Sequence, residues 1–125
     1  MKTALFNHVV NVLRLVATPG SIQEKLYNDK VVVADEVALD YSDAVQQANV
    51  LLINKEISSE IYEQLLSLDT DFDQMANNPQ LWDRNAFLND QKWKNIRNKA
   101  LSILSAMKET YELPYLDTDN TYIFE

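Results

Sequence analysis

The stretch that decides the fold is residues 35–53, DEVALDYSDAVQQANVLLI. Its apolar side chains recur every three or four residues, which is the period of an amphipathic helix sustained over about four turns. These apolar positions are Val37, Tyr41, Ala44, Val45, Ala48, Leu51 and Leu52. The sequence therefore predicts one long helix from about Asp35 to Ile53, with Val31–Val33 as an extended lead-in or first turn.

The same spacing predicts two helices before this stretch. The first covers about Thr3–Ala17 and stops at Thr18-Pro19-Gly20, where proline and glycine interrupt the pattern. Ser21, with Glu24 three residues later, has the form of a capping box. We expect it to start a short second helix that ends near Asn28-Asp29.

Three more helices are predicted after it. Asn54 is a candidate N-cap for a helix closed by segment 69–73, Asn78-Pro79 is a cap and first-turn pair, and Asn89 or Asp90 caps a last long helix. The short helix runs through Leu81, Trp82 and Leu88. In the other two helices, the side chains expected to face inward are Ile57, Ile61, Leu65, Leu68, Trp93, Ile96, Ala100, Ile103, Leu104 and Met107.

Turn-forming residues are scarce, because the chain has one glycine and three prolines. This composition is too poor in turns for a many-stranded β fold. We therefore predict an all-α fold: residues 1–125 form a single-domain bundle of five or six helices with a short irregular or hairpin-like C-terminal tail. A chain of 125 residues is long enough to bury a core without disulfides or metals.

The residue types argue against several classes of function. There is no cysteine and one histidine, His8, so the usual zinc and nucleophilic sites cannot be assembled, and no phosphate-binding glycine loop is present. We expect no enzyme activity, no cofactor and no metal. No segment is apolar enough to span a membrane, and the net charge of -8 disfavours direct binding to nucleic acid or anionic lipid. The absence of cysteine fits a cytoplasmic location.

Charge is strongly segregated along the chain. Residues 31–83 hold eleven acids and one base, Lys55, whereas residues 84–108 hold six bases and one acid, Asp90. Because like charges on neighbouring helical turns cost about 0.2–0.5 kcal/mol per pair, such a surface opposes folding unless something compensates it. A cationic partner would do so, although a plainly solvated face is the competing interpretation.

Two acidic triplets follow helical spacing. Glu36, Asp40 and Asp43 share one face of the long helix, and Glu56, Glu60 and Glu63 repeat the same spacing on the next helix. If the two helices are neighbours, their negative potentials add and steer a cationic protein into contact.

A third acidic group, Asp69, Asp71 and Asp73, suggests a calcium loop by its alternation. The EF-hand pattern fails, because Gln74 stands where glycine is needed and Gln80 where a bidentate glutamate is needed. We therefore interpret these aspartates as a carboxylate-rich loop that extends the acidic surface.

The tail combines aromatic and acidic residues. Tyr111, Tyr115 and Tyr122 are interleaved with five acids over residues 109–125. Tyrosine beside carboxylate is a typical combination for contacting a basic protein. The alternative is that the tail only covers the core, and a hairpin turn at 117–120 would serve that purpose. In the basic segment, Arg84, Arg97 and the lysines are possible internal partners for the acidic helices.

Taken together, the small, acidic, cysteine-free helical chain resembles the bacterial immunity proteins, which inhibit contact-dependent, type VI or colicin-like toxins. The nearest local likeness is Leu81-Trp82 followed by Trp93-Lys-Asn-Ile-Arg97 and Ala100-Leu101. The chain lacks the paired-tyrosine element of the nuclease-colicin inhibitors, so no binding residue is carried over. The resemblance implies tight binding to a cognate toxin, often a basic nuclease.

The expected function is therefore neutralisation of a basic bacterial toxin through an acidic surface. Two alternatives remain: a DNA-mimic or antirestriction-type inhibitor, which would bind DNA-handling enzymes broadly, and a helical scaffold or adaptor that uses an apolar groove. The candidate partner-binding residues are Glu36, Asp40, Asp43, Glu56, Glu60, Glu63, Asp69, Asp71, Asp73, Tyr111, Tyr115 and Tyr122.

Overall fold

The protein is a helical bundle, seen in a computed structural model that describes residues 2–27 and 30–114. Within those residues its elements are α1 (Ala4–Ala17), α2 (Gly20–Leu26), α3 (Val33–Gln46), α4 (Ala48–Ile53), α5 (Ser59–Ala76), the 3-10 helix η1 (Pro79–Trp82), α6 (Arg84–Asn89) and α7 (Gln91–Ala106). The prediction of an all-α single domain is confirmed, and no strand occurs in the described part of the chain.

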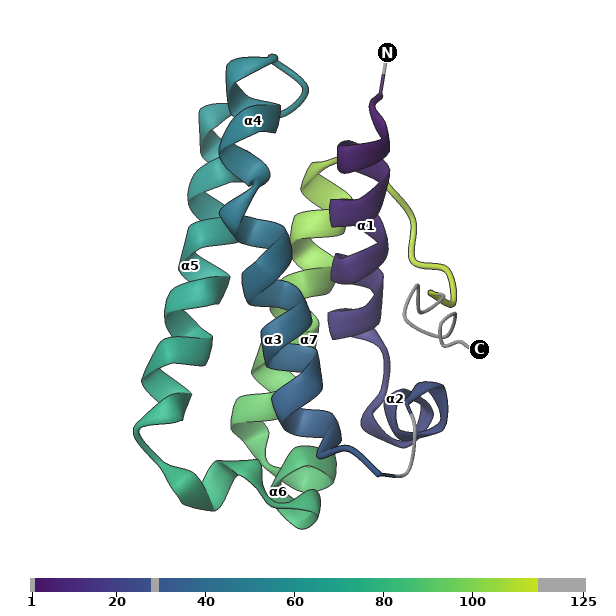
Figure 1. Ribbon diagram of the computed structural model, residues 1–125, viewed down its shortest axis with the longest axis vertical. Helices are drawn as coiled ribbons and strands as arrows, with labels where there is room; N and C mark the ends of the chain where they lie inside the picture. The colour runs from purple at the N-terminus through teal and green to yellow at the C-terminus, as the bar shows by residue number, and fades with distance from the viewer. Residues whose placement is uncertain (1, 28–29, 115–125) are drawn as a thin grey trace.

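Four long helices form the body of the bundle, and each runs antiparallel to its neighbours (Figure 1). Helix α1 packs against α3 and α7, and α5 packs against the same two helices on the other side. Helix α2 closes one end together with η1 and α6, whereas α4 extends α3 toward the opposite end. This up-down-up-down order follows from short connections between helices that each bury one apolar stripe.

Trp93 occupies the centre of the core at the end closed by α6. Its side chain is fully buried, and its ring centroid lies 4.9 Å from that of Phe87, 5.4 Å from that of Trp82 and 5.9 Å from that of Phe72. The indole N–H donates a 2.7 Å hydrogen bond to the carbonyl of Leu81. The tryptophan therefore joins α5, η1 and α6 to α7.

Arg97 is a buried cation held by neutral groups. Its guanidinium donates to Gln23 Oε1 at 3.1 Å and to the carbonyl of Phe87 at 2.7 Å, and it lies 4.8 Å from the centre of the Phe87 ring. Burial lowers the pKa of Arg97 to about 10. A Cβ at Gly20 would stand 2.8 Å from Nη2 of this arginine, so α2 approaches α7 closely because Gly20 has no side chain. Arg97 thus serves the fold rather than the acidic helices.

The predicted long helix is wrong in its length. It starts two residues earlier, at Val33, and divides at Gln47, whose backbone N–H bonds to the carbonyl of Ala44 instead of continuing the regular ladder. The apolar stripe continues across this break, because Ala44, Ala48 and Leu51 are all buried. The periodicity therefore predicted the buried face correctly, but it did not predict that the helix is divided at Gln47.

Several predicted caps also differ. The capping box at Ser21 does not form, because α2 begins at Gly20 after Pro19 and Glu24 instead pairs with Arg84. Asn54 is the C-cap of α4, and Ser58 caps α5 by accepting from the N–H of Ile61 at 3.1 Å.

Two other predicted caps are confirmed. Asn78 accepts from the N–H of Gln80 and opens η1, and Asp90 accepts from the N–H of Lys92 and caps α7. The short helix expected after Asn78 is divided into η1 and α6, because Asp83 caps a separate α6 by accepting from the N–H of Ala86.

Helices α4 and α7 end in the same way, with a lysine where glycine is usual. Lys55 and Lys108 have φ values of 61° and 63°. In each case the following N–H reaches back five residues, from Glu56 to Leu51 and from Glu109 to Leu104, as in a Schellman motif.

We expect Lys108→Gly to raise the free energy of unfolding by about 1 kcal/mol, because a side chain in this left-handed conformation costs about 1–2 kcal/mol and glycine returns part of the gain as chain entropy. Urea unfolding followed by circular dichroism measures the change. Lys94→Gly is the matched control, because Lys94 is a solvent-exposed residue within α7. Its free energy of unfolding should fall by about 1 kcal/mol. A loss at both positions would contradict the argument.

Candidate protein-binding surface

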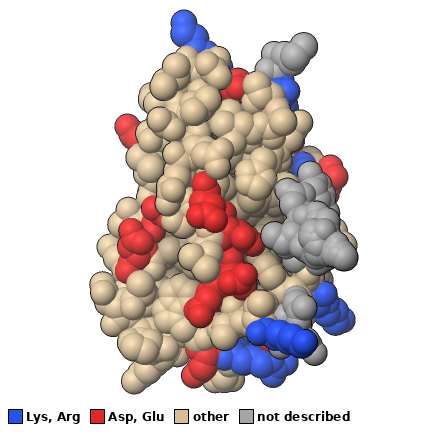
Figure 2. Space-filling model, in the orientation of Figure 1, with Lys and Arg blue, Asp and Glu red and all other residues tan. Residues whose placement is uncertain are grey.

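Acidic side chains gather on the face formed by α3 and α5 (Figure 2). The register of the two helices follows from Tyr41, which is buried between them: its hydroxyl donates to the carbonyl of Leu65 at 2.6 Å and its ring packs against Phe72. The α3 acids are therefore level with the C-terminal half of α5. We call the resulting surface the acidic face; its members are Glu36, Asp40, Asp43, Asp69 and Asp73.

Partial burial and like-charge repulsion both act on carboxylates of the acidic face. The pKa of Glu36 is raised by partial burial and then by Asp40 and Asp35. The pKa of Asp69 is raised by partial burial and then by Asp73. Burial, followed by the charges of Asp69 and Asp71, also raises the pKa of the Tyr41 hydroxyl between the helices. On each helix, one carboxylate thus disfavours the ionised form of its neighbour along the same helix, and a nearby cation would relieve this repulsion.

Internal bases compensate little of this face. On α7, Lys99 pairs with Asp71 at 2.7 Å, and on α6 Arg84 pairs with Glu24 at 2.7 Å. No ion pair among the described residues involves Glu36, Asp43, Asp69 or Asp73, and Asp40 accepts a 2.6 Å hydrogen bond from the Tyr27 hydroxyl. Within residues 2–27 and 30–114, the predicted internal neutralisation by the last helix is therefore restricted to Asp71.

The second predicted triplet is not part of this face. Glu56 precedes α5 and accepts from the N–H of Thr3 at 2.8 Å, so it does not share a helical face with Glu60 and Glu63. The other two lie exposed in the first two turns of α5, level with α4 rather than with the acids of α3. Glu60 also interacts favourably with the α5 dipole, which gives it a structural role.

The third predicted group is not a loop. Segment 69–73 lies within α5, which continues to Ala76. Helical geometry places Asp69 and Asp73 on one face, four residues apart, while Asp71 points toward α7 and meets Lys99. The described residues contain no group of three His, Asp or Glu side chains placed to hold a metal ion.

The start of the tail is fastened to α1. Arg14 donates to the carbonyl of Thr110 at 2.9 Å and contacts the carboxylates of Glu109 and Glu112, and the Tyr111 hydroxyl lies 2.8 Å from Thr18 Oγ1. Up to Pro114, the tail therefore covers the side of the bundle formed by α1. Tyr115, Tyr122 and the predicted hairpin turn lie outside the described residues.

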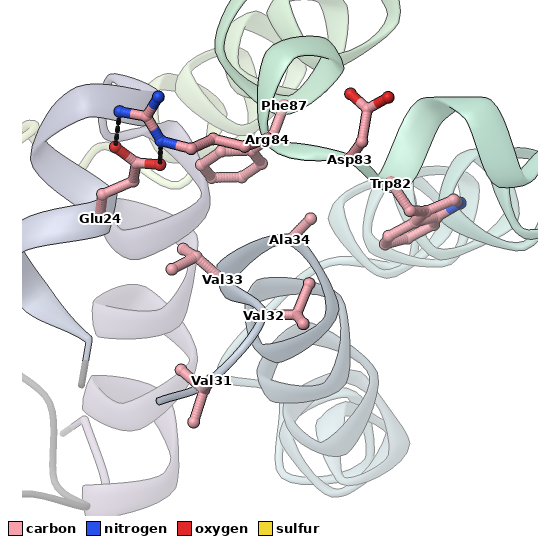
Figure 3. Close-up of a pocket in the computed structure, with 9 residues that line it drawn as sticks. All are labelled: Glu24, Val31, Val32, Val33, Ala34, Trp82, Asp83, Arg84 and Phe87. Atoms are coloured by element: carbon pink, nitrogen blue, oxygen red, sulfur yellow. Dashed lines mark hydrogen bonds and ion pairs between the residues drawn. The ribbon is translucent and has the colours of Figure 1, made fainter. Parts of the chain in front are cut away.

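A hollow at the N-terminal end of α3 was not predicted from the sequence. It has a volume of about 590 Å³ and lies between the start of α3 and the η1–α6 segment (Figure 3). Its lining consists of Glu24, Val31, Val32, Val33, Ala34, Trp82, Asp83, Arg84 and Phe87. The three consecutive valines were a signal, because an amphipathic helix needs only some of them inside, and Val32 is 57% exposed.

The chain matches no protein-family model, no curated protein sequence and no solved structure. None of the helices in residues 2–27 and 30–114 is long and apolar enough to cross a membrane.

Glu36→Gln tests whether the acidic face opposes folding. Because the folded-state pKa of Glu36 is raised, folding favours its protonated form, so its penalty is full at pH 7 and disappears as pH falls through the raised pKa toward 4.5 and below. We expect the variant to melt at a higher temperature than the wild type at pH 7 and at the same temperature at pH 4.

Removing the repulsion between Glu36 and Asp40 should by itself raise the free energy of unfolding by about 0.2–0.5 kcal/mol at pH 7. This increase should be smaller in 1 M NaCl, because salt screens the two charges. Glu63→Gln removes one charge outside the acidic face and is the control. An equal gain from Glu63→Gln would mean that net charge, rather than the local cluster, sets the effect.

Proposed function

We propose that this protein neutralises a basic bacterial toxin by binding it through the acidic face, as an immunity protein. The observation that carries the proposal is that Glu36, Asp43, Asp69 and Asp73, on two packed helices, form no ion pair with any base in the described part of the chain. Their mutual repulsion is relieved when a cationic surface approaches, so the repulsion present in the free protein adds to the affinity for such a partner.

The shape of the surface supports a protein ligand. The acidic face spreads over two helices, and Leu39, 56% exposed, is next to Asp40 in the sequence and one helical turn before Asp43 on α3. Polar and charged groups around apolar contacts are the usual composition of a protein interface. In such an interface, the acidic side chains raise the association rate and select the partner, and the apolar side chains contribute most of the binding free energy.

A capture experiment tests the function. The immobilised protein is mixed with lysate of its native cell at low salt and eluted with increasing NaCl, and the captured protein is identified and assayed for toxicity. We expect one basic protein whose toxic activity is abolished at one equivalent of this chain. Capture without inhibition of any activity would overturn the proposal.

A DNA mimic is the second candidate, because closely spaced carboxylates on one face can imitate phosphates. It predicts binding to unrelated DNA-handling proteins, whereas an immunity protein binds one cognate toxin. A panel of unrelated DNA-binding proteins, titrated at one salt concentration, separates the two. Equal binding across the panel would move the assignment to the mimic.

A further inference from the structure

The hollow at the start of α3 adjoins the acidic face. Val32 is the N-cap of α3, Glu36 follows one turn later and Asp40 one turn after that. At a rise of 1.5 Å per residue, the two carboxyl-bearing residues lie about 6 Å and 12 Å along the helix from the hollow. The acidic stripe of α3 therefore begins at the mouth of an apolar cavity.

The walls of the hollow are apolar and its charged groups are mainly negative. In Figure 3 the Val32 side chain points toward Trp82, and the Glu24–Arg84 pair spans the opposite side above Phe87. Arg84 is bound by both Glu24 oxygens, at 2.7 Å and 3.1 Å, so its charge is compensated. Asp83 is exposed and adds one more carboxylate, which also accepts from the N–H of Ala86 as the N-cap of α6. An apolar group accompanied by positive charge fits this lining.

We infer that the hollow receives an apolar anchor side chain from the same cationic partner that the acidic face binds. The inference rests on the proposed function and names the chemistry of the bound segment. In an extended chain of about 3.3 Å per residue, lysine or arginine two and four positions from the anchor comes level with Glu36 and Asp40. A volume of about 590 Å³ accommodates a phenylalanine or tryptophan side chain with its neighbouring backbone.

Synthetic peptides provide the test. The probe is acetyl-Phe-Ser-Lys-Ser-Lys-amide together with the reversed order, and the matched control has serine in place of phenylalanine. Nuclear magnetic resonance titration reports affinity and location at once, through the indole N–H of Trp82 and the backbone N–H of Val32. We expect the phenylalanine peptide to bind about tenfold tighter than the serine peptide, which corresponds to about 1.4 kcal/mol, because the hollow removes part of the ring surface from water.

Two variants locate the effect. Val32→Ser removes one apolar wall at an exposed position and should erase most of the phenylalanine advantage while leaving the serine peptide unchanged. Val50→Ser, at a 43% exposed position on α4 away from the hollow, is the matched control and should change neither peptide. The resonances of Trp82 should shift with the phenylalanine peptide alone.

Other results overturn the inference in distinguishable ways. Equal binding of both peptides would leave the acidic face intact and remove the anchor site. Binding of neither peptide at low salt would remove the electrostatic basis of the proposed function itself. Phenylalanine-dependent binding that is unaffected by salt and by Glu36→Lys would make the hollow a separate apolar site. Dimerisation abolished by Val32→Ser would make a second copy its occupant.

Discussion

Replacing Trp93 with alanine is expected to lower the free energy of unfolding by about 3–5 kcal/mol, which corresponds to a fall in melting temperature of about 10–20 °C. The loss combines the transfer of a large ring from the core with the cavity left among Phe72, Trp82 and Phe87. The carbonyl of Leu81 also loses its hydrogen-bond donor. A domain of this size has about 5–15 kcal/mol in total, so the variant is close to the limit of stable folding.

Differential scanning calorimetry measures the effect, and Trp82→Ala is the matched control. Trp82 lies at the same end of the bundle and its indole N–H donates to Met75, but its side chain is only half-buried. The free energy of unfolding should therefore fall less for Trp82→Ala than for Trp93→Ala. A loss below 1 kcal/mol for Trp93→Ala would mean that the aromatic cluster does not organise this end of the core.

The buried faces of the helices could be predicted from the sequence because they depend on local spacing alone. The inward positions expected for α5 and α7, such as Leu65, Ile96 and Leu104, are buried in the structure. The break at Gln47 could not be predicted, since neither glycine nor proline marks it and the apolar stripe passes through it unchanged. Both α3 and α4 pack against α1 and α5, so the break is a local change of the backbone at Gln47 that the side-chain pattern does not mark.

The composition of the acidic face depended on distant contacts, which spacing does not report. The partner of the α3 stripe was predicted to be Glu56, Glu60 and Glu63, the next acids in helical phase. The antiparallel register fixed by Tyr41 instead brings Asp69 and Asp73 level with it. In the same way, Glu24 fitted a local capping box but binds Arg84, sixty residues away in the sequence. Charge segregation could be read from the sequence, whereas its arrangement required the fold.

Charge reversal on the acidic face should slow association with the captured basic partner by about 10- to 1,000-fold at low salt, because electrostatic steering raises association rates by that range. Asp43→Lys combined with Asp73→Lys is the informative variant. Both side chains are exposed, and neither has an ion pair among the described residues, so the substitutions leave the core untouched. Stopped-flow measurements over a range of NaCl concentrations give the rate and its salt dependence.

Glu60→Lys combined with Glu63→Lys is the matched control, because it changes the net charge equally on the part of α5 level with α4. The argument requires a position-specific effect: the first pair should abolish most of the salt dependence, and the second should retain most of it. Equal slowing by both pairs would reduce the acidic face to a contribution of net charge. The distinction between the two pairs is sharpest near about 0.15 M salt, where screening limits a charge to about 8 Å, so that carboxylates facing the partner govern the encounter and distant ones do not.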